Sequence, residues 1–212
     1  MKISKLLIPL FLLQALTLSG QKDQEALKIL DRFSSVASSA PSISMKFRMS
    51  TFDQTENRKD TLSGSIILSK NKYRLDMPDN IVWFNGENSW SYLTAEKEVT
   101  ISKPDRKDNS FQNKPSAIFT LYKSGYKYRL IEEGTLSYTI DLYPEDINTD
   151  MFRVRLVIGK SNMDLKSLEY KKKEGVIITL DITNYNLSLK PSADTFIFHP
   201  EKFKDAELID VR

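Results

Sequence analysis

The stretch "NIVWFNGENSW" (residues 80–90) holds both tryptophans of the chain, at positions 83 and 90. Asn85 and Gly86 lie between them, and Asn-Gly favours a tight hairpin because both residues tolerate a positive φ. With an even-length turn, Trp83 and Trp90 lie on the same face of the two strands, together with Ile81. Three roles are open to these rings: ordinary core, a sugar-binding platform, or the wall of a site for a hydrophobic ligand.

Period-two alternation of apolar and polar residues continues on both sides of this hairpin and predicts antiparallel strands with one buried face. The predicted strands, about 11 in number, cover residues 43–50, 64–68, 72–77, 81–83, 90–92, 99–101, 126–130, 136–142, 152–158, 176–182 and 196–198. A sheet of this size with one continuous apolar face must curl to hide it.

Two segments break the alternation and predict helices. "DQEALKILDRFSSVAS" (23–38) places apolar residues on one helical stripe, with Asp23 as the cap. "NKPSAIFTLYKSG" (113–125) begins near a proline, ends at a glycine and predicts a short helix of about two turns. Its apolar residues at helical spacing are Ala117, Ile118, Leu121 and Tyr122.

The first twenty residues have the features of a secretory signal peptide. Lys2 and Lys5 precede a short apolar run, and small residues follow up to Gly20. The run is too short to span a bilayer. We therefore expect residues 1–20 to be a signal peptide and residues 21–212 to form a single domain in the periplasm.

Composition excludes several kinds of site. The chain has no cysteine, which rules out disulfides, thiol nucleophiles and a lipid anchor on cysteine, so we expect a soluble protein. The single histidine, His199, lies in "FIFHPEKF" without an obvious acidic or nucleophilic partner, so we expect a structural role. Removal of the signal lowers the formal net charge from +3 to +1, and no basic cluster suggests nucleic-acid binding. We expect neither metal, cofactor nor enzymatic activity.

The apolar face of the predicted sheet favours a ligand cavity over a fully packed core. Only two helices are available to cover the face, and large barrels enclose a lumen rather than fill it. The tryptophan rings are expected on this face, beside methionines that adapt to irregular contents, which argues against a sugar platform. The residues predicted to line the cavity are Met45, Phe47, Met49, Ile66, Leu68, Tyr73, Leu75, Met77, Ile81, Trp83, Trp90, Tyr92, Val99, Ile101, Tyr138, Ile140, Val154 and Leu156.

The order of these parts resembles the LolA family, the periplasmic carriers of outer-membrane lipoproteins. The resemblance is carried by the opening helix, "GSIILSKNKYRLDMP" (64–78), "NIVWFNGENSWSYL" (80–93), "KPSAIFTLY" (114–122) and "TFIFHPEKFKDAELIDVR" (195–212). It implies an unclosed, highly curved antiparallel β half-barrel, with a helical lid over a hydrophobic cavity that receives acyl chains. It also implies acylated lipoproteins or lipids as cargo, loading by an inner-membrane ABC transporter complex, and delivery to the outer membrane. We expect a monomer.

The sequence departs from the family at the lid latch. The family commonly has Arg-Pro after the glycine-led strand, whereas this chain has Lys70-Asn71. Lysine keeps the charge but lacks the planar five-donor fork of arginine, so the resemblance makes Lys70 the latch candidate with a weaker or different latch. Arg74 and Arg48 are possible substitutes.

Three alternatives to a lipoprotein carrier remain. The first is a related periplasmic lipid-binding carrier or sensor with another hydrophobic ligand. The second is a lipid-anchored acceptor, which the missing cysteine disfavours. The third is a carboxylate-based glycosidase, which is disfavoured because the acidic residues fall on the predicted wet faces and turns.

Overall fold

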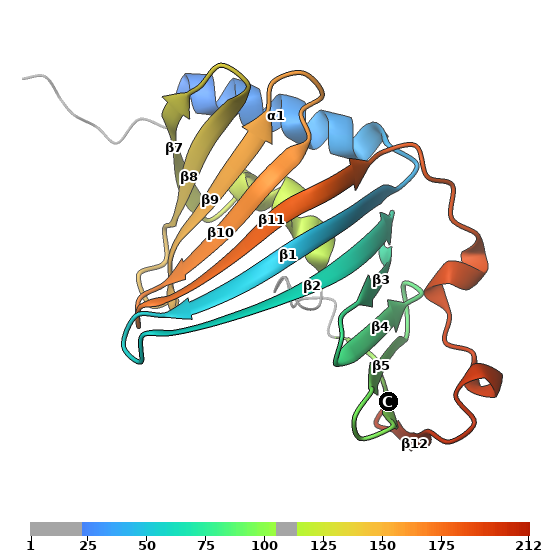
Figure 1. The fold of residues 1–212 in the computed structure, drawn as a ribbon. Coiled ribbons are helices and arrows are strands. Elements are labelled where there is room, and N and C mark those ends of the chain that lie inside the picture. The colour runs from blue at the N-terminus through green and yellow to red at the C-terminus, as the bar shows by residue number, and fades with distance from the viewer. Residues whose placement is uncertain (1–22, 105–113) are drawn as a thin grey trace, which may run out of the picture.

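The computed structural model describes residues 23–104 and 114–212 (Figure 1). The predicted signal peptide lies outside the described residues. The helical segments are α1 (Gln24–Ser39) and four short 3₁₀ turns: η1 (Pro115–Phe119), η2 (Leu121–Lys123), η3 (Ala193–Phe196) and η4 (Pro200–Lys202). The strands are β1 (Ile43–Asp53), β2 (Arg58–Ser69), β3 (Lys72–Asp76), β4 (Asn80–Phe84), β5 (Ser89–Leu93), β6 (Glu98–Ser102), β7 (Tyr126–Glu133), β8 (Ser137–Pro144), β9 (Met151–Gly159), β10 (Leu165–Lys172), β11 (Val176–Asn186) and β12 (Glu207–Asp210).

The strands form one sheet of 12 in the order β12-β6-β5-β4-β3-β2-β1-β11-β10-β9-β8-β7. It does not close, because β12 and β7 are its two edges. All neighbours pair antiparallel except β12, which runs parallel to β6. The sheet curves, with β3 to β5 bending away from the broad part formed by β7 to β11, β1 and β2 (Figure 1). The predicted curved, unclosed and mainly antiparallel sheet is confirmed. Two of its strands, β10 and β12, were not among the predicted ones.

Helix α1 begins as its sequence predicts. The carboxylate of its N-cap Asp23 accepts hydrogen bonds from the backbone N–H groups of Glu25 and Ala26. Its other oxygen accepts from the N–H of Leu130 in β7, which ties the helix to the sheet edge. The apolar stripe, including Leu30 and Phe33 at 0% exposure, is buried against the sheet. We refer to the sheet face covered by α1 as the inner face.

The predicted short helix is two successive 3₁₀ turns, η1 and η2, which we call the lid. Hydrogen bonds from residue i+3 to residue i, such as Thr120 N–H to Ala117 C=O, define this tighter geometry. Gly125 follows at a φ of +76°, where the chain turns into β7. The lid packs on the same side of the sheet as α1, where both lie behind the strands in Figure 1.

Residues 192–206, which we call the strap, differ from their prediction. Residues 196–198 were expected to form a strand; instead Phe196 ends η3, and Phe198 follows it as a buried ring. Pro200 begins η4 directly afterwards, and proline has no N–H for a strand ladder. The strap therefore contributes aromatic rings to the core without joining the sheet. Leu136, expected on the buried face of a strand, lies in the turn before β8 and is 80% exposed.

Candidate functional site

The inner face carries the main apolar cluster of the protein. Tyr73 and Leu75 of β3 lie opposite Phe84 and Val82 of β4, and all four belong to or pack against this cluster. The predicted cavity residues found here are Met45, Phe47, Met49, Ile66, Leu68, Tyr73, Leu75, Met77, Tyr138, Ile140, Val154 and Leu156. These residues come from β1, β2, β3, β8 and β9, with Met77 just after β3, so the curvature of the sheet brings distant strands around one apolar volume.

A small apolar cavity of about 30 Å³ remains inside this cluster. Its walls are Met45, Phe47, Ile66, Leu75, Ile118, Leu165, Leu168, Leu180 and Ile182. The sequence analysis did not select the four wall residues from β10 and β11. Leu180 and Ile182 alternate within β11, whereas Leu165 and Leu168 are three residues apart across a register shift in β10, so period-two alternation could not reveal them. A volume of this size holds about one water molecule, so the cavity is too small for an acyl chain in this structure.

Six predicted cavity residues lie elsewhere: the prediction that the tryptophans share a face with Tyr73 and Leu75 is wrong. Arg74, not Tyr73, lies opposite Trp83. Ile81, Trp83, Trp90, Tyr92, Val99 and Ile101 form a second cluster with the strap residues Phe198, Phe203 and Ala206. In each hairpin from β2 to β6, odd-numbered residues lie opposite even-numbered ones. A sheet face that carries the odd-numbered residues of one strand therefore carries the even-numbered residues of the next. The sequence contains this signal in its turn lengths.

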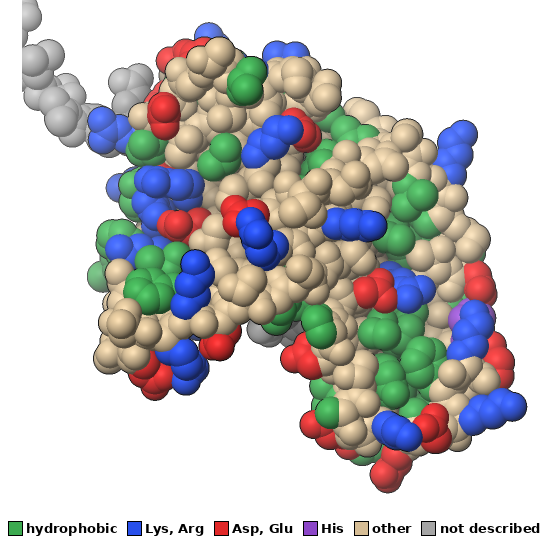
Figure 2. All heavy atoms as spheres, in the orientation of Figure 1, with side chains coloured by type: hydrophobic (Ala, Val, Ile, Leu, Met, Phe, Trp, Pro, Cys, Tyr) green, Lys and Arg blue, Asp and Glu red, His purple; other side chains and the backbone are tan. Residues whose placement is uncertain are grey.

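The second cluster lies on the outer face, which Figure 2 shows with hydrophobic side chains gathered over β4 and β5. The Trp83 ring is 4% exposed and packs edge-on against Phe198 and Phe203, with centroid distances of 5.4 and 5.6 Å. The guanidinium of Arg74 lies 5.6 Å from the centroid of Trp83. These fixed neighbours give Trp83 the surroundings of a packed core residue.

The lid is held to α1 by both apolar and polar contacts. Ile118, Phe119 and Tyr122 are buried, whereas Ala117 and Leu121 are half-buried. The Phe119 ring lies 5.2 Å from that of Phe33 in α1. The sequence analysis did not select Phe119 among the lid residues.

A phenol–carboxylate hydrogen bond adds a polar tie between the lid and α1. The Tyr122 hydroxyl donates to Asp31 Oδ1 over 2.6 Å. Burial and this hydrogen bond raise the pKa of Tyr122 to about 12, so the phenol stays a neutral donor at ordinary pH. No helical spacing within the lid could reveal this contact, because Asp31 belongs to another element.

Lys70, the latch candidate, lies at the mouth of a second pocket of about 400 Å³, which we call the rim pocket. The pocket is lined by Ala37, Ser38, Ala40, Ser42, Ile43, Leu68, Lys70, Lys114, Ser116, Phe119 and Thr120. Lys70 thus lines the same pocket as Phe119 and Thr120, and its role as a latch stays a prediction. The alternatives Arg74 and Arg48 instead pair with Asp76 and Asp181.

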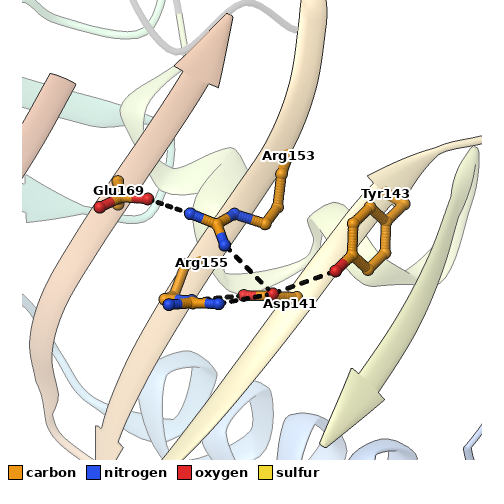
Figure 3. Close-up of polar contacts among 5 residues, drawn as sticks. All are labelled: Asp141, Tyr143, Arg153, Arg155 and Glu169. Carbon is orange, nitrogen blue, oxygen red and sulfur yellow. Dashed lines mark hydrogen bonds and ion pairs between the residues drawn. The ribbon is translucent and has the colours of Figure 1, made fainter. Parts of the chain in front are cut away.

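The outer face of β8 to β10 carries a buried charged network (Figure 3). Asp141, with a side chain only 2% exposed, accepts two hydrogen bonds from Arg155, at 2.7 and 2.8 Å, and one from the Tyr143 hydroxyl at 3.1 Å. Arg153 bridges Asp141 and Glu169. Burial alone raises the pKa of Asp141, but the two arginines outweigh it and hold that pKa below its usual range. The two carboxylates and two guanidinium groups balance in charge, and we interpret the network as a structural element that holds β8, β9 and β10 together.

His199 has acidic neighbours, contrary to the expectation from the sequence. Its Nε2 lies 2.8 Å from Asp194 Oδ1, and its Nδ1 lies 3.0 Å from Glu201 Oε1. Both carboxylates belong to the strap, so the contacts join η3 to η4. Within residues 23–104 and 114–212, no group of three or more histidine and acidic side chains could hold a metal ion.

Comparisons with known proteins identify similar chains. The model of the family described as outer membrane lipoprotein carrier protein LolA matches residues 16–188. An uncharacterised conserved protein from Thermus thermophilus has a similar structure, with a TM-score of 0.59 at 14% identity, covering 88% of this chain and 99% of that one. A LolA superfamily protein from Nitrosomonas europaea has a TM-score of 0.42 at 13% identity, covering 82% and 97%. No curated protein sequence matches.

In the described part of the chain, no helix has the length and apolar character needed to cross a bilayer.

Proposed function

Because the chain belongs to the family of the outer membrane lipoprotein carrier protein LolA, we propose that it carries acylated cargo across the periplasm, from the inner to the outer membrane. The observation that carries this proposal is the apolar inner face covered by the two short 3₁₀ turns of the lid. Ile118 of the lid lies in the wall of the residual cavity, so movement of the lid would open that cavity to solvent and to an acyl chain.

The energetics of this arrangement support a reversible carrier. Each acyl methylene hidden from water gains about 0.8 kcal/mol, so a chain of about sixteen carbons gains on the order of 12 kcal/mol gross. The buried Ile118, Phe119 and Tyr122 must leave part of their own contacts when a chain enters. Their displacement lowers the net affinity, and a carrier needs such a limit if it is to release its cargo.

The proposal includes a compartment and partners. Residues 1–20 act as the export signal, and the mature protein, beginning near Gln21, works without a lipid anchor. Loading comes from an inner-membrane ABC transporter complex, and delivery is to the outer membrane. The family is one of carriers, and we propose no catalytic step. Cell fractionation and N-terminal sequencing test the compartment; protein that stays with membranes after salt and alkaline washing would contradict it.

Binding of a fluorescent sixteen-carbon fatty acid tests the acyl site directly. Leu75→Glu places an unpartnered carboxylate on the half-buried inner face and should weaken binding at least about tenfold. Ile67→Glu is the matched control, because Ile67 is also half-buried but lies opposite Arg74 on the outer face of the neighbouring strand. Equal effects of both substitutions, or no binding to the wild type, would overturn the proposal.

Mass spectrometry of organic extracts from the protein purified out of its native periplasm then identifies the cargo. Diacylglyceryl-modified protein fragments support the lipoprotein carrier. Free lipid as the dominant extract supports the alternative of a related carrier with another hydrophobic ligand.

A further inference from the structure

The rim pocket differs chemically from the apolar cavity. Two lysines, Lys70 and Lys114, lie at its edge, and the hydroxyl-bearing Ser116 and Thr120 of the lid segment add hydrogen-bonding groups. No carboxylate occurs among the described residues that line it. Its volume of about 400 Å³ lies within the range of roughly 300–1,000 Å³ typical of small-ligand pockets. Lysines and hydroxyl groups in a pocket of this size suit a ligand that carries an anionic group on an apolar chain.

The rim pocket and the apolar cavity are lined by neighbouring residues of the same two paired strands. Ile43 of β1 pairs with Leu68 of β2, and both line the rim pocket. Two residues further along, Met45 pairs with Ile66, and both line the apolar cavity. Two strand residues span roughly 7 Å. The two spaces therefore lie next to each other along the inner face, and we take them as two sections of the path proposed for the ligand.

The lid borders both sections of this path. Phe119 lines the rim pocket, and the adjacent Ile118 lines the apolar cavity. One movement of η1 would therefore change both spaces together.

We propose that the rim pocket binds the anionic head group of a lipid, a phosphate ester held by Lys70 and Lys114, while the acyl chain enters the cavity beneath Ile118. This inference rests on the acyl site of the proposed function and selects the alternative cargo, a free lipid, with an anionic head group. Lysine is a common phosphate ligand and acts there as a point charge. The C-terminal end of α1 also lies at the pocket. It contributes about −0.5 elementary charge, which the two lysines outweigh.

The backbone holds Lys70 in position for this role. It lies in the two-residue turn between β2 and β3, at a φ of +54°. Ser69 and Lys72 pair on either side of the turn, so the sheet fixes where the Lys70 side chain leaves the backbone. An ammonium group there can meet a ligand without rearrangement of the strands.

Calorimetric titration with three probes tests the proposal: 1-palmitoyl lysophosphatidic acid, 1-palmitoylglycerol and glycerol 3-phosphate. The first two share one acyl chain and differ in the phosphate; the third is the phosphate ester alone. Wild type should bind lysophosphatidic acid at least about tenfold more tightly than palmitoylglycerol, since a charge-assisted contact of this kind strengthens binding by about that factor. Higher ionic strength should reduce this preference.

The double variant Lys70→Gln/Lys114→Gln should lose the preference for lysophosphatidic acid over palmitoylglycerol, because it removes the charges that distinguish the two lipids. Lys46→Gln is the matched control, because Lys46 is exposed beside Met45 on the opposite face of β1. Three results would overturn the inference while the acyl site stands: equal affinities for the two lipids in wild type, a double variant that weakens both lipids equally, or a double variant that leaves the preference intact. Glycerol 3-phosphate binding as tightly as lysophosphatidic acid would indicate a free phosphate-ester site and also overturn it. If neither lipid binds, the proposed function fails as well.

Discussion

Removal of the hydrogen bond between Tyr122 and Asp31 should destabilise the closed position of the lid. Tyr122→Phe removes the hydroxyl that donates to Asp31 Oδ1 over 2.6 Å and keeps the ring that packs near Tyr128. Hydrogen bonds to charged groups contribute about 1.5–3 kcal/mol. Asp31 is exposed, so water replaces the missing hydroxyl in the variant. The loss of free energy of lid closure should therefore lie at the lower end of this range.

A loss of about 1.4 kcal/mol shifts the equilibrium between closed and open lid roughly tenfold towards the open state. If the closed state dominates in the wild type, the apparent affinity for the fluorescent fatty acid should rise by about the same factor. Hydrogen exchange of the lid amides in residues 115–123 should accelerate in parallel.

Tyr143→Phe is the control for this variant. It also removes a phenol–carboxylate hydrogen bond, of 3.1 Å to Asp141, but on the outer face. It should lower the free energy of unfolding without changing acyl affinity or lid exchange. If Tyr122→Phe leaves both lid exchange and affinity at wild-type values, the Tyr122–Asp31 contact does not close the lid.

The same hydrogen bond predicts a response to alkaline pH. Burial and the hydrogen bond to Asp31 raise the pKa of Tyr122 to about 12 in the folded state, from its ordinary value of 10.0. Because this pKa is raised, the neutral phenol stabilises the closed state fully below about pH 10. Its contribution to the free energy of closure is lost as the pH rises through 12. Acyl affinity should therefore increase over this interval in the wild type and less in Tyr122→Phe.

Three further substitutions probe the packing. Trp83→Ala should lower the free energy of unfolding by about 3–5 kcal/mol, and the fluorescence of Trp83 should not respond to fatty acid, because its ring packs on the outer face; a titratable signal from this residue would contradict that placement. Gly64→Ala should cost about 1–3 kcal/mol, since its Cβ would lie 2.7 Å from the Phe47 ring, and chemical denaturation measures this loss. Asp141→Asn should cost about 3–5 kcal/mol by leaving Arg155 without its carboxylate. Because the pKa of Asp141 is lowered, the wild-type contribution is present above about pH 4 and is lost in more acidic solution; the variant should lack this acid dependence.

Local patterns in the sequence predicted the elements of this fold. Asp23 and the apolar stripe after it predicted α1, because a cap and a 3.6-residue period act within one segment. Alternation predicted β1 to β9 and β11 but missed β10 and β12. Pro115 with Gly125 predicted the limits of the lid. Residues 196–198 alternate like a strand but form none, because Pro200 and the packing of Phe198 on Trp83 override the local pattern.

The sequence by itself determined that the chain forms an antiparallel sheet interrupted by a short helical segment, since periodicity and turn residues are local properties. Only the tertiary structure decided which apolar face each residue joins. The apolar side changes from the inner face at Tyr73 and Leu75 to the outer face at Trp90 and Val99. A period of two shows that alternate residues of a strand share a face of the sheet. The register across each turn, and the strap that covers the outer face, decide whether that face is the inner or the outer one. The tie between Tyr122 and Asp31 likewise joins residues 91 positions apart, and only folding brings such residues together.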